Sequence, residues 1–221
     1  MSRLATGNKT VRYLPSPTPP LEDDEGVTLL LAHANGLHKE TWGALVGYLF
    51  DAMGKSEGVT VREAWSIECP NHGESAVLNE AAIERVHKGE WNGWEWPRAI
   101  HTFLRSKPAG VDFFAPSVKR KIVGIGHSQG GNAIVFLSTL SPRLPVHSYI
   151  LLDPTISIHM PARDRMVRIM TALTYPKRDC FLSRDDAFQY LRAQPGTRNW
   201  HADVLKALSG IWIQVIEWSD I

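Results

Sequence analysis

The sequence predicts an α/β fold in which helices flank a mainly parallel sheet. Four short apolar blocks, each suited to a strand, alternate with segments whose apolar residues recur at helical spacing. Strands that alternate with helices form βαβ units, and these build parallel sheets with right-handed crossovers. A sharp glycine-rich turn also joins the third apolar block directly to the helix that follows it.

The predicted elements follow from these patterns in order. Runs of apolar residues bounded by turn residues predict strands at 27–32, 59–67, 121–126 and 148–153. Apolar residues at helical spacing predict helices at 41–53, 91–106 and 131–140.

The last quarter of the chain changes in character. Residues 160–207 are basic and amphipathic and show no evident buried strand, so we interpret them as a helical cap inserted in a single domain of residues 1–221. Residues 208–221 form the end of the chain, in which 211–216 are predicted to form either one strand or an exposed apolar segment.

The composition indicates a globular protein without a strongly charged partner. Hydrophobic residues make up 43% and charged residues 21%, and 24 Lys and Arg nearly balance 23 Asp and Glu. This balance favours neither nucleic acid nor an anionic membrane as a partner. The apolar run 27–32 is too short to span a bilayer. Cys69 and Cys180 lack the spacing of a metal site, and we expect no cofactor.

The motif Gly126-His127-Ser128-Gln129-Gly130 carries the strongest functional signal. It follows a predicted buried strand at once and opens an apolar helix. In that context G-x-S-x-G is a nucleophile elbow, which is typical of α/β-hydrolases. Glycines are needed because larger side chains would collide in so sharp a turn. Ser128 is therefore the predicted catalytic nucleophile, and the alternative is a serine that only caps the helix.

Two backbone amides are predicted to form an oxyanion hole. Acyl transfer places negative charge on an oxygen, which fixed N–H donors stabilise. The donors expected in this fold are the amide after the nucleophile, here Gln129, and one in the loop after the first central strand, here Asn35. The alternative for Asn35 and Gly36 is a simple turn between strand and helix.

The acid and the base are less clearly marked. Asp153 ends the strand after the nucleophile helix and is a candidate catalytic acid, although Asp153-Pro154 also makes a good turn. The histidines beyond Ser128 are His147, His159 and His201, and none follows a late strand. His72 precedes the nucleophile, whereas the usual order is serine, acid, histidine, so we predict a structural role in a turn. The triad is therefore predicted to lack its histidine.

Five segments resemble those of one group of fungal enzymes. They are His33-Ala34-Asn35-Gly36-Leu37-His38-Lys39-Glu40-Thr41-Trp42, Pro70-Asn71-His72-Gly73-Glu74-Ser75, Gly126-His127-Ser128-Gln129-Gly130-Gly131-Asn132, Leu152-Asp153-Pro154 and Arg184-Asp185-Asp186-Ala187-Phe188. Across about residues 12–208 the chain resembles the α/β-hydrolases that take part in the biosynthesis of host-selective AK-, AF- and ACT-toxins in plant-pathogenic moulds.

This resemblance implies a function in fungal secondary metabolism and virulence. The implied chemistry is hydrolysis of an ester or thioester of a small-molecule acyl substrate, during synthesis of the epoxy-decatrienoic acid part of a toxin. It also implies a peroxisomal location. Residues 219–221, Ser-Asp-Ile, lack the basic middle residue of a peroxisomal tripeptide, so the cytoplasm is the alternative.

Two hypotheses for activity follow from the resemblance. Full-length members of the group look to continue into further strands and a C-terminal histidine, whereas residues 208–221 diverge from them. The first hypothesis is an active serine hydrolase, and the second is a truncated copy that is catalytically inactive or redundant. The sequence does not indicate an oligomeric state.

Overall fold

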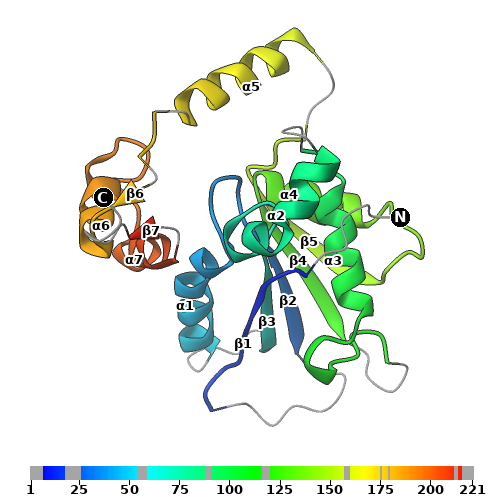
Figure 1. Cartoon of the computed structure of the whole chain (residues 1–221). Helices are drawn as coiled ribbons and strands as arrows, with labels where there is room; N and C mark the ends of the chain where they lie inside the picture. Colours follow the sequence, from blue (N-terminus) through cyan, green and yellow to red (C-terminus); the bar gives the residue numbers. More distant parts are fainter. Residues whose placement is uncertain are drawn as a thin grey trace. The chain divides into compact units, whose positions relative to one another are not determined.

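Five strands form one sheet in the order β1-β3-β2-β4-β5. The four strands β2 (Val27–Ala32), β3 (Val61–Ile67), β4 (Lys121–His127) and β5 (Val146–Leu152) run parallel, and β1 (Thr10–Tyr13) pairs antiparallel with β3 (Figure 1). The computed structural model thus confirms the predicted α/β class and its mainly parallel sheet.

The structure describes residues 7–17, 26–53, 59–87, 91–115, 120–156, 160–174, 176–178, 180–211 and 214–215. The chain divides into two compact units, Met1–Pro154 and Thr155–Ile221, and the sheet belongs to the first. Within the described ranges, no helix combines the length and the apolar character that crossing a membrane requires.

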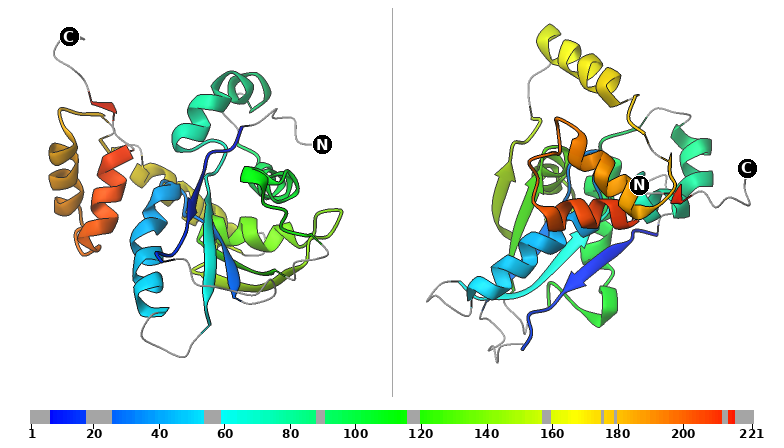
Figure 2. Two further views of the ribbon diagram at one scale, coloured as in Figure 1. Left: turned by 90° about the horizontal axis from the view of Figure 1, so that it is seen from below. Right: turned by 90° about the vertical axis from the view of Figure 1, so that its left-hand side faces the viewer.

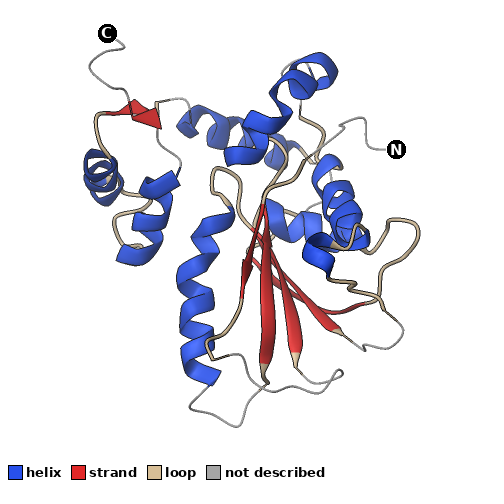
Figure 3. Ribbon diagram, turned by 60° about the horizontal axis from the view of Figure 1, so that its bottom comes forward, coloured by secondary structure: helices blue, strands red, loops and turns tan. Residues whose placement is uncertain are grey.

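Helices cover both faces of the sheet in the first unit. Alternate side chains of a strand point to opposite faces. Leu30 and Ala32 of β2 accordingly pack in a cluster with α3 (Glu95–Arg105) and α4 (Gln129–Leu137), while Leu29 and Leu31 pack in a second cluster with α1 (Gly43–Met53). Views along the sheet show α1 on one side of the strands and α3 and α4 on the other (Figure 2 and Figure 3).

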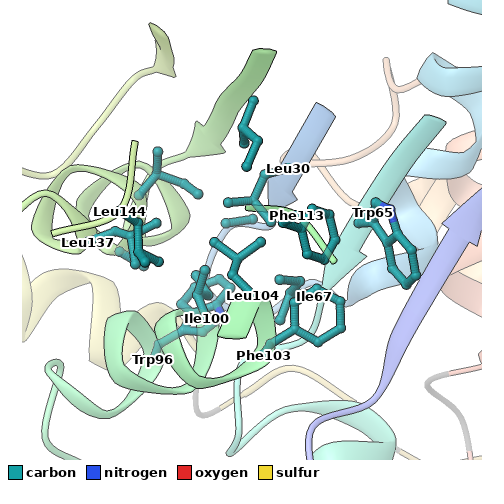
Figure 4. Close-up of a cluster of buried hydrophobic side chains, with 14 of the residues drawn as sticks. Leu30, Trp65, Ile67, Trp96, Ile100, Phe103, Leu104, Phe113, Leu137 and Leu144 are labelled. Carbon is teal, nitrogen blue, oxygen red and sulfur yellow. The ribbon is translucent and has the colours of Figure 1, made fainter. Parts of the chain in front are cut away.

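The larger cluster lies between the sheet and α3 and α4 and is rich in aromatic rings (Figure 4). The ring of Trp65 meets Phe103 and Phe113 edge-on, at centroid distances of 5.5 and 5.6 Å. Trp96 and Ile100 of α3 are fully buried beside them. Each such side chain contributes about 1.5–3 kcal/mol by its removal from water, so α3 is firmly anchored to the sheet.

Most elements of the first unit match their predicted positions. The four parallel strands lie where the apolar blocks predict them, with shifts of one or two residues at their ends. The predicted helix 41–53 begins as the 3₁₀ turn η1 (Lys39–Trp42) and continues as α1. A second 3₁₀ turn, η2 (Pro108–Gly110), follows α3.

Besides η2, two elements of the first unit were not predicted. β1 is four residues long and adds to the margin of the sheet. The helix α2 (Gly73–His87) is largely exposed, and its only fully buried residues are the polar Ser75 and Asn79. Because α2 buries no apolar stripe, the apolar periodicity that reveals helices is absent from its sequence.

The second unit contains three helices and a short strand pair among its described residues. They are α5 (Pro161–Thr174), β6 (Cys180–Phe181), α6 (Arg184–Ala193), α7 (Ala202–Ile211) and β7 (Gln214–Val215). β6 lies in the segment where the sequence shows no evident buried strand, and of its two residues Phe181 is buried and Cys180 half-buried. A two-residue strand is too short to produce a recognisable apolar block. The roles of residues 160–207 as a cap and 208–221 as a tail stay predictions.

Candidate active site

Ser128 stands at a sharp bend between β4 and α4. Its backbone has φ 53° and ψ −116°, a conformation that residues other than glycine rarely adopt. The Ser128 N–H donates to the Leu152 carbonyl at 2.9 Å, and its own carbonyl accepts from the Asn132 N–H at 3.3 Å. Such strain persists where surrounding structure fixes it, and it gathers at functional sites. A strained serine between a strand and a helix fits the predicted nucleophile elbow, while the role of Ser128 as the nucleophile stays a prediction.

Two glycines make this bend possible. A Cβ on Gly126 would lie 2.5 Å from backbone atoms of Gly130 and Gly131. A Cβ on Gly130 would lie 2.5 Å from the Ala32 carbonyl carbon and the His33 carbonyl oxygen. Real Cβ atoms do not approach backbone so closely, so both positions require glycine. Because Gly130 touches the end of β2, the start of α4 lies directly against the loop that follows β2.

The loop after β2 contains the predicted oxyanion donor Asn35. β2 and β4 are adjacent and parallel, with Ala32 opposite Gly126, so the loop and the elbow share the carboxyl edge of the sheet. The first N–H groups of a helix have no partner within the helix, and Gln129 is the first residue of α4. The structure thus brings the segments of Asn35 and Gln129 together, while their role as donors stays a prediction.

His72 holds the loop after β2. Its Nε2 accepts the Gly36 N–H at 3.0 Å, and its Nδ1–H donates to the Asn71 side-chain oxygen at 2.8 Å. An imidazole that donates through one nitrogen and accepts through the other is neutral. Burial, together with the neighbouring His38, lowers the pKa of His72 to about 4. The sequence predicts a structural role in a turn for His72. In the structure, His72 lies in the loop after β3 and its partner Gly36 lies in the loop after β2.

His33 makes the corresponding hydrogen bond from the loop after β2, where it accepts an N–H of the loop after β3. Its Nδ1–H donates to the Ala34 carbonyl at 2.9 Å, and its Nε2 accepts the Cys69 N–H at 3.0 Å. The side chain is fully buried, and its ring packs on those of His72 and Trp96 at centroid distances of 5.3 and 4.8 Å. Burial, and then His72, lower the pKa of His33 to about 3, so this ring is also neutral near pH 7.

A buried ionic cluster lies beside these histidines. Lys39, only 2% exposed, places its Nζ 2.6 Å from Glu40, 2.8 Å from Glu74 and 3.4 Å from Glu68. His38 contributes a bond of 2.8 Å from Nδ1 to Glu40. Bonds from His38 and Lys39 outweigh the effect of burial and hold the pKa of Glu40 at about 2. Lys39 thus joins the loops after β2 and β3 by charge.

Asp153 lies next to the elbow along the edge of the sheet. Leu152 pairs with His127 in the register of β4 and β5, so the residues that follow them, Asp153 and Ser128, are neighbours at the carboxyl edge. Asp153 is exposed and has φ 45°, which fits the turn expected with Pro154. An exposed carboxylate at this edge can orient a histidine. The catalytic role of Asp153 stays a prediction.

None of the histidines beyond Ser128 is placed beside it within the first unit. His147 lies near the amino end of β5, five residues before Leu152, which is about 16 Å along a strand. His159 lies outside the described residues. His201 belongs to the second unit, where its Nδ1 is 3.5 Å from Asp203. The base is therefore not assigned to any of these three.

Comparison with known proteins places the chain among hydrolases. A sequence profile of the Alpha/beta hydrolase family matches residues 29–218. The chain is 29% identical over 183 residues to Type I acyl-CoA thioesterase mpaH of Penicillium brevicompactum, covering 82% of this chain and 39% of that protein. It is 37% identical over 91 residues to Abhydrolase domain-containing protein ACTT2-1 of Alternaria alternata, covering 41% of this chain and 33% of that protein. The chain thus spans less than half the length of these relatives.

Solved structures share the fold at low sequence identity. The peroxisomal alpha-beta-hydrolase Lpx1 of Saccharomyces cerevisiae matches with a TM-score of 0.65 at 20% identity, covering 96% of this chain and 63% of that one. A thioesterase domain from the curacin biosynthetic pathway matches with a TM-score of 0.56 at 13% identity, covering 93% of this chain and 67% of that one. With the strained serine between β4 and α4 and the profile match over most of its length, this chain belongs to the alpha/beta hydrolase family.

Proposed function

We propose that this chain acts as a serine hydrolase on an acyl thioester or ester, with Ser128 as the nucleophile. The observation that carries the proposal is the bend at Ser128, with φ 53° and ψ −116°, held against the loop after β2 by the contact at Gly130. A serine that served only as a helix cap would gain nothing from this strain. At an elbow, the strain presents the hydroxyl above the sheet.

The reaction would proceed through an acyl-enzyme. The Ser128 Oγ attacks the acyl carbonyl carbon while a histidine base removes the hydroxyl proton. The carbonyl oxygen becomes negative and is held by the N–H groups of Asn35 and Gln129. The C–S or C–O bond then breaks, and the leaving thiolate or alkoxide takes the proton. Water attacks the acyl-serine in the same way and releases the acid.

Asp153 would orient the histidine base. Its position beside Ser128 along the carboxyl edge supports this role, since an acid there can accept the Nδ1–H of a ring that faces the serine. The aspartate would also stabilise the imidazolium formed when the base takes the proton. We assign no histidine to this step. The two histidines of the loops after β2 and β3, His33 and His72, each already use Nε2 to accept a backbone N–H.

The substrate proposed is a small-molecule acyl thioester. Support comes from the name of the Penicillium relative, an acyl-CoA thioesterase, and from the resemblance to toxin-cluster hydrolases. The finer proposal is that the acyl group is the polyunsaturated ten-carbon chain of an epoxy-decatrienoic acid, within biosynthesis of a host-selective toxin. The formal net charge of only +1 is compatible with an acyl group as the recognised part of the substrate.

A peroxisomal location is proposed on the same grounds. The toxin-cluster resemblance supports it, and a peroxisomal hydrolase is among the proteins that share the fold. Expression of the chain in a filamentous fungus, with a fluorescent protein at its N-terminus, should give puncta that overlap a peroxisomal marker. Diffuse cytoplasmic fluorescence would count against this proposal and would leave the catalytic one unaffected.

A fluorophosphonate probe tests the catalytic proposal, because it phosphonylates only activated serines. We expect one adduct per chain, located on Ser128 by peptide mass spectrometry. Release of free thiol from a decatrienoyl thioester should exceed release from aromatic acyl thioesters.

Asp153→Asn should lower kcat for thioester hydrolysis by about 10³–10⁴-fold. Asp112→Asn is the matched control, since Asp112 pairs with Lys107 away from the elbow and should not affect the rate.

Failure of this test has a defined meaning. A folded chain that neither reacts with the probe nor releases thiol would support the alternative hypothesis of an inactive or redundant copy. Labelling at another serine would contradict the assignment of Ser128.

A further inference from the structure

The loops after β2 and β3 are tied together by two hydrogen bonds that run in opposite directions. We call residues 33–38 the β2 loop and residues 68–72 the β3 loop. His33 of the β2 loop accepts the Cys69 N–H of the β3 loop at 3.0 Å, and His72 of the β3 loop accepts the Gly36 N–H of the β2 loop at 3.0 Å. Each loop thus supplies one imidazole and one amide.

We propose that His33 and His72 form a reciprocal clasp that positions the Asn35 amide as an oxyanion donor. Both are positioning residues, because they act through the backbone of the β2 loop. The inference rests on the proposed function in one respect, the use of the Asn35 amide in acyl transfer. The clasp itself stands on the hydrogen bonds and ring contacts of the two histidines.

Nearby hydrogen-bond acceptors fix both imidazole rings in the tautomer that the clasp requires. The Nδ1–H of His33 is held by the Ala34 carbonyl, and the Nδ1–H of His72 by the Asn71 side-chain oxygen. That oxygen also accepts the Cys69 S–H at 3.0 Å, which identifies it as the acceptor end of the amide. With Nδ1 protonated in each ring, Nε2 is left as a lone-pair acceptor for the opposite loop.

The bond to His72 sets the direction of one peptide plane. The Leu37 N–H donates to the Ala34 carbonyl at 3.1 Å, so residues 34–37 form a β-turn with Asn35 and Gly36 at its centre. Gly36 has φ 73° and Asn35 is not among the residues of positive φ, which makes the turn type II. In types I and II the central peptide faces opposite ways, and His72 holds it in one of them.

This geometry selects Asn35 over Gly36 as the donor. The Gly36 N–H is occupied by His72 and cannot bind a substrate oxygen at the same time. Among the described residues, the Asn35 N–H makes no hydrogen bond that would compete. The clasp therefore fixes the peptide that follows the donor, in a loop already pressed against α4 through Gly130.

Packing keeps the two rings in place. The rings of His33 and His72 lie 5.3 Å apart between centroids, and Trp96 covers His33 from the side of α3. The titratable groups near them are His38, which acts on both rings, and Glu40, which acts on His33, and burial keeps both rings neutral. Lys39, which pairs with Glu68 and Glu74, adds a third link between the segments that follow β2 and β3.

Matched substitutions separate the acceptor from the shape of the side chain. His72→Met removes the acceptor, whereas His72→Gln has nearly the same length and offers an amide oxygen near the Nε2 position. In His72→Met we expect hydrogen exchange at the Gly36 amide to rise at least tenfold. The rate constant for phosphonylation of Ser128 should fall about 10–100-fold, somewhat less than for complete loss of an oxyanion donor. His72→Gln should restore most of the protection of the Gly36 amide and most of the phosphonylation rate.

The His33 pair provides the reciprocal test. His33→Met should raise exchange at the Cys69 amide, and His33→Gln should restore its protection. His101→Met is the control for loss of a buried histidine, since His101 bonds to the Pro142 carbonyl outside the site. It should lower the melting temperature without changing the phosphonylation rate or exchange at Gly36.

The outcomes distinguish the clasp from the catalytic proposal. Wild-type exchange at Gly36 in a folded His72→Met chain would overturn the clasp, whatever the activity. If the Met variant does not fold, a His72→Gln chain that has lost protection at Gly36 would overturn it as well. Slow Gly36 exchange in the wild type that is lost in His72→Met, with no reaction of Ser128, would support the clasp and reject the catalytic proposal. Normal phosphonylation of His72→Met with fast Gly36 exchange would overturn the positioning role.

Discussion

Replacement of Ser128 by alanine is expected to abolish fluorophosphonate labelling and to lower kcat for thioester hydrolysis by a factor on the order of 10⁶. The acyl-enzyme cannot form without the hydroxyl, and the oxyanion donors alone supply only a small part of the rate. Labelling and released thiol are the measurements. Labelling that persists in Ser128→Ala would mean that another serine is the nucleophile.

A companion variant tests the strain at the elbow. Ser128→Gly should be as inactive as Ser128→Ala but more stable than it by about 1 kcal/mol, because glycine adopts φ 53° with little strain. At Ser138, which ends α4 with φ −65°, the order should reverse, and glycine should be the less stable substitution. Denaturant unfolding measures both pairs. Equal stability of the two Ser128 variants would show that the bend is not strained in solution.

Gly130→Ala is expected to destabilise the fold by about 3 kcal/mol or more and to abolish labelling of Ser128. The new Cβ would meet the carbonyl groups of Ala32 and His33, which belong to backbone at the end of β2 and cannot rotate away. Relief of the clash requires α4 to move from the β2 loop, and that movement would carry the Gln129 amide away from the substrate oxygen.

Gly47→Ala is the control for this change. Gly47 lies in α1, where a Cβ would have no atom within 4 Å. Alanine should therefore stabilise that helix by about 0.5–1 kcal/mol and leave labelling unchanged. Midpoints of urea unfolding measure both variants. A Gly130→Ala chain with wild-type stability and labelling would contradict the close approach of α4 and β2.

The elbow could be predicted from sequence because its determinants are local. The motif around Ser128 fixes its own bend through small residues at set positions, and the strand before it is a clear apolar block. The same holds for the strand ending at Ala32 and the turn at Gly36. Pattern and composition therefore indicate the sheet, the bend and the loop that faces it.

The clasp could not be predicted because it depends on pairing between distant segments. His33 and Cys69 are 36 residues apart, as are Gly36 and His72. Which nitrogen meets which amide is decided by the register of β2 against β3 and by burial of the rings. A histidine directly after a buried strand, as at His33, is the only sequence signal that could have drawn attention to this arrangement.

The missed secondary structure has equally specific causes. α2 exposes most of its surface, and β1 and β6 are too short for alternation to be recognised. β5 was recognised from its apolar residues, yet Tyr149 to Leu152 are each 37–47% exposed. A run of apolar residues predicts a strand, but it does not predict whether both faces of that strand are buried by other elements.

The position of β5 has a consequence for Ser128, the proposed nucleophile. Among the described strands of the sheet, β5 lies at one edge and β1 at the other, and the Leu152 carbonyl of β5 accepts the Ser128 N–H. Outermost strands separate from a sheet more readily than inner ones, because they are hydrogen-bonded along one side. Ser128 is thus held on one side by an edge strand, and fraying of β5 would break the hydrogen bond that holds its backbone.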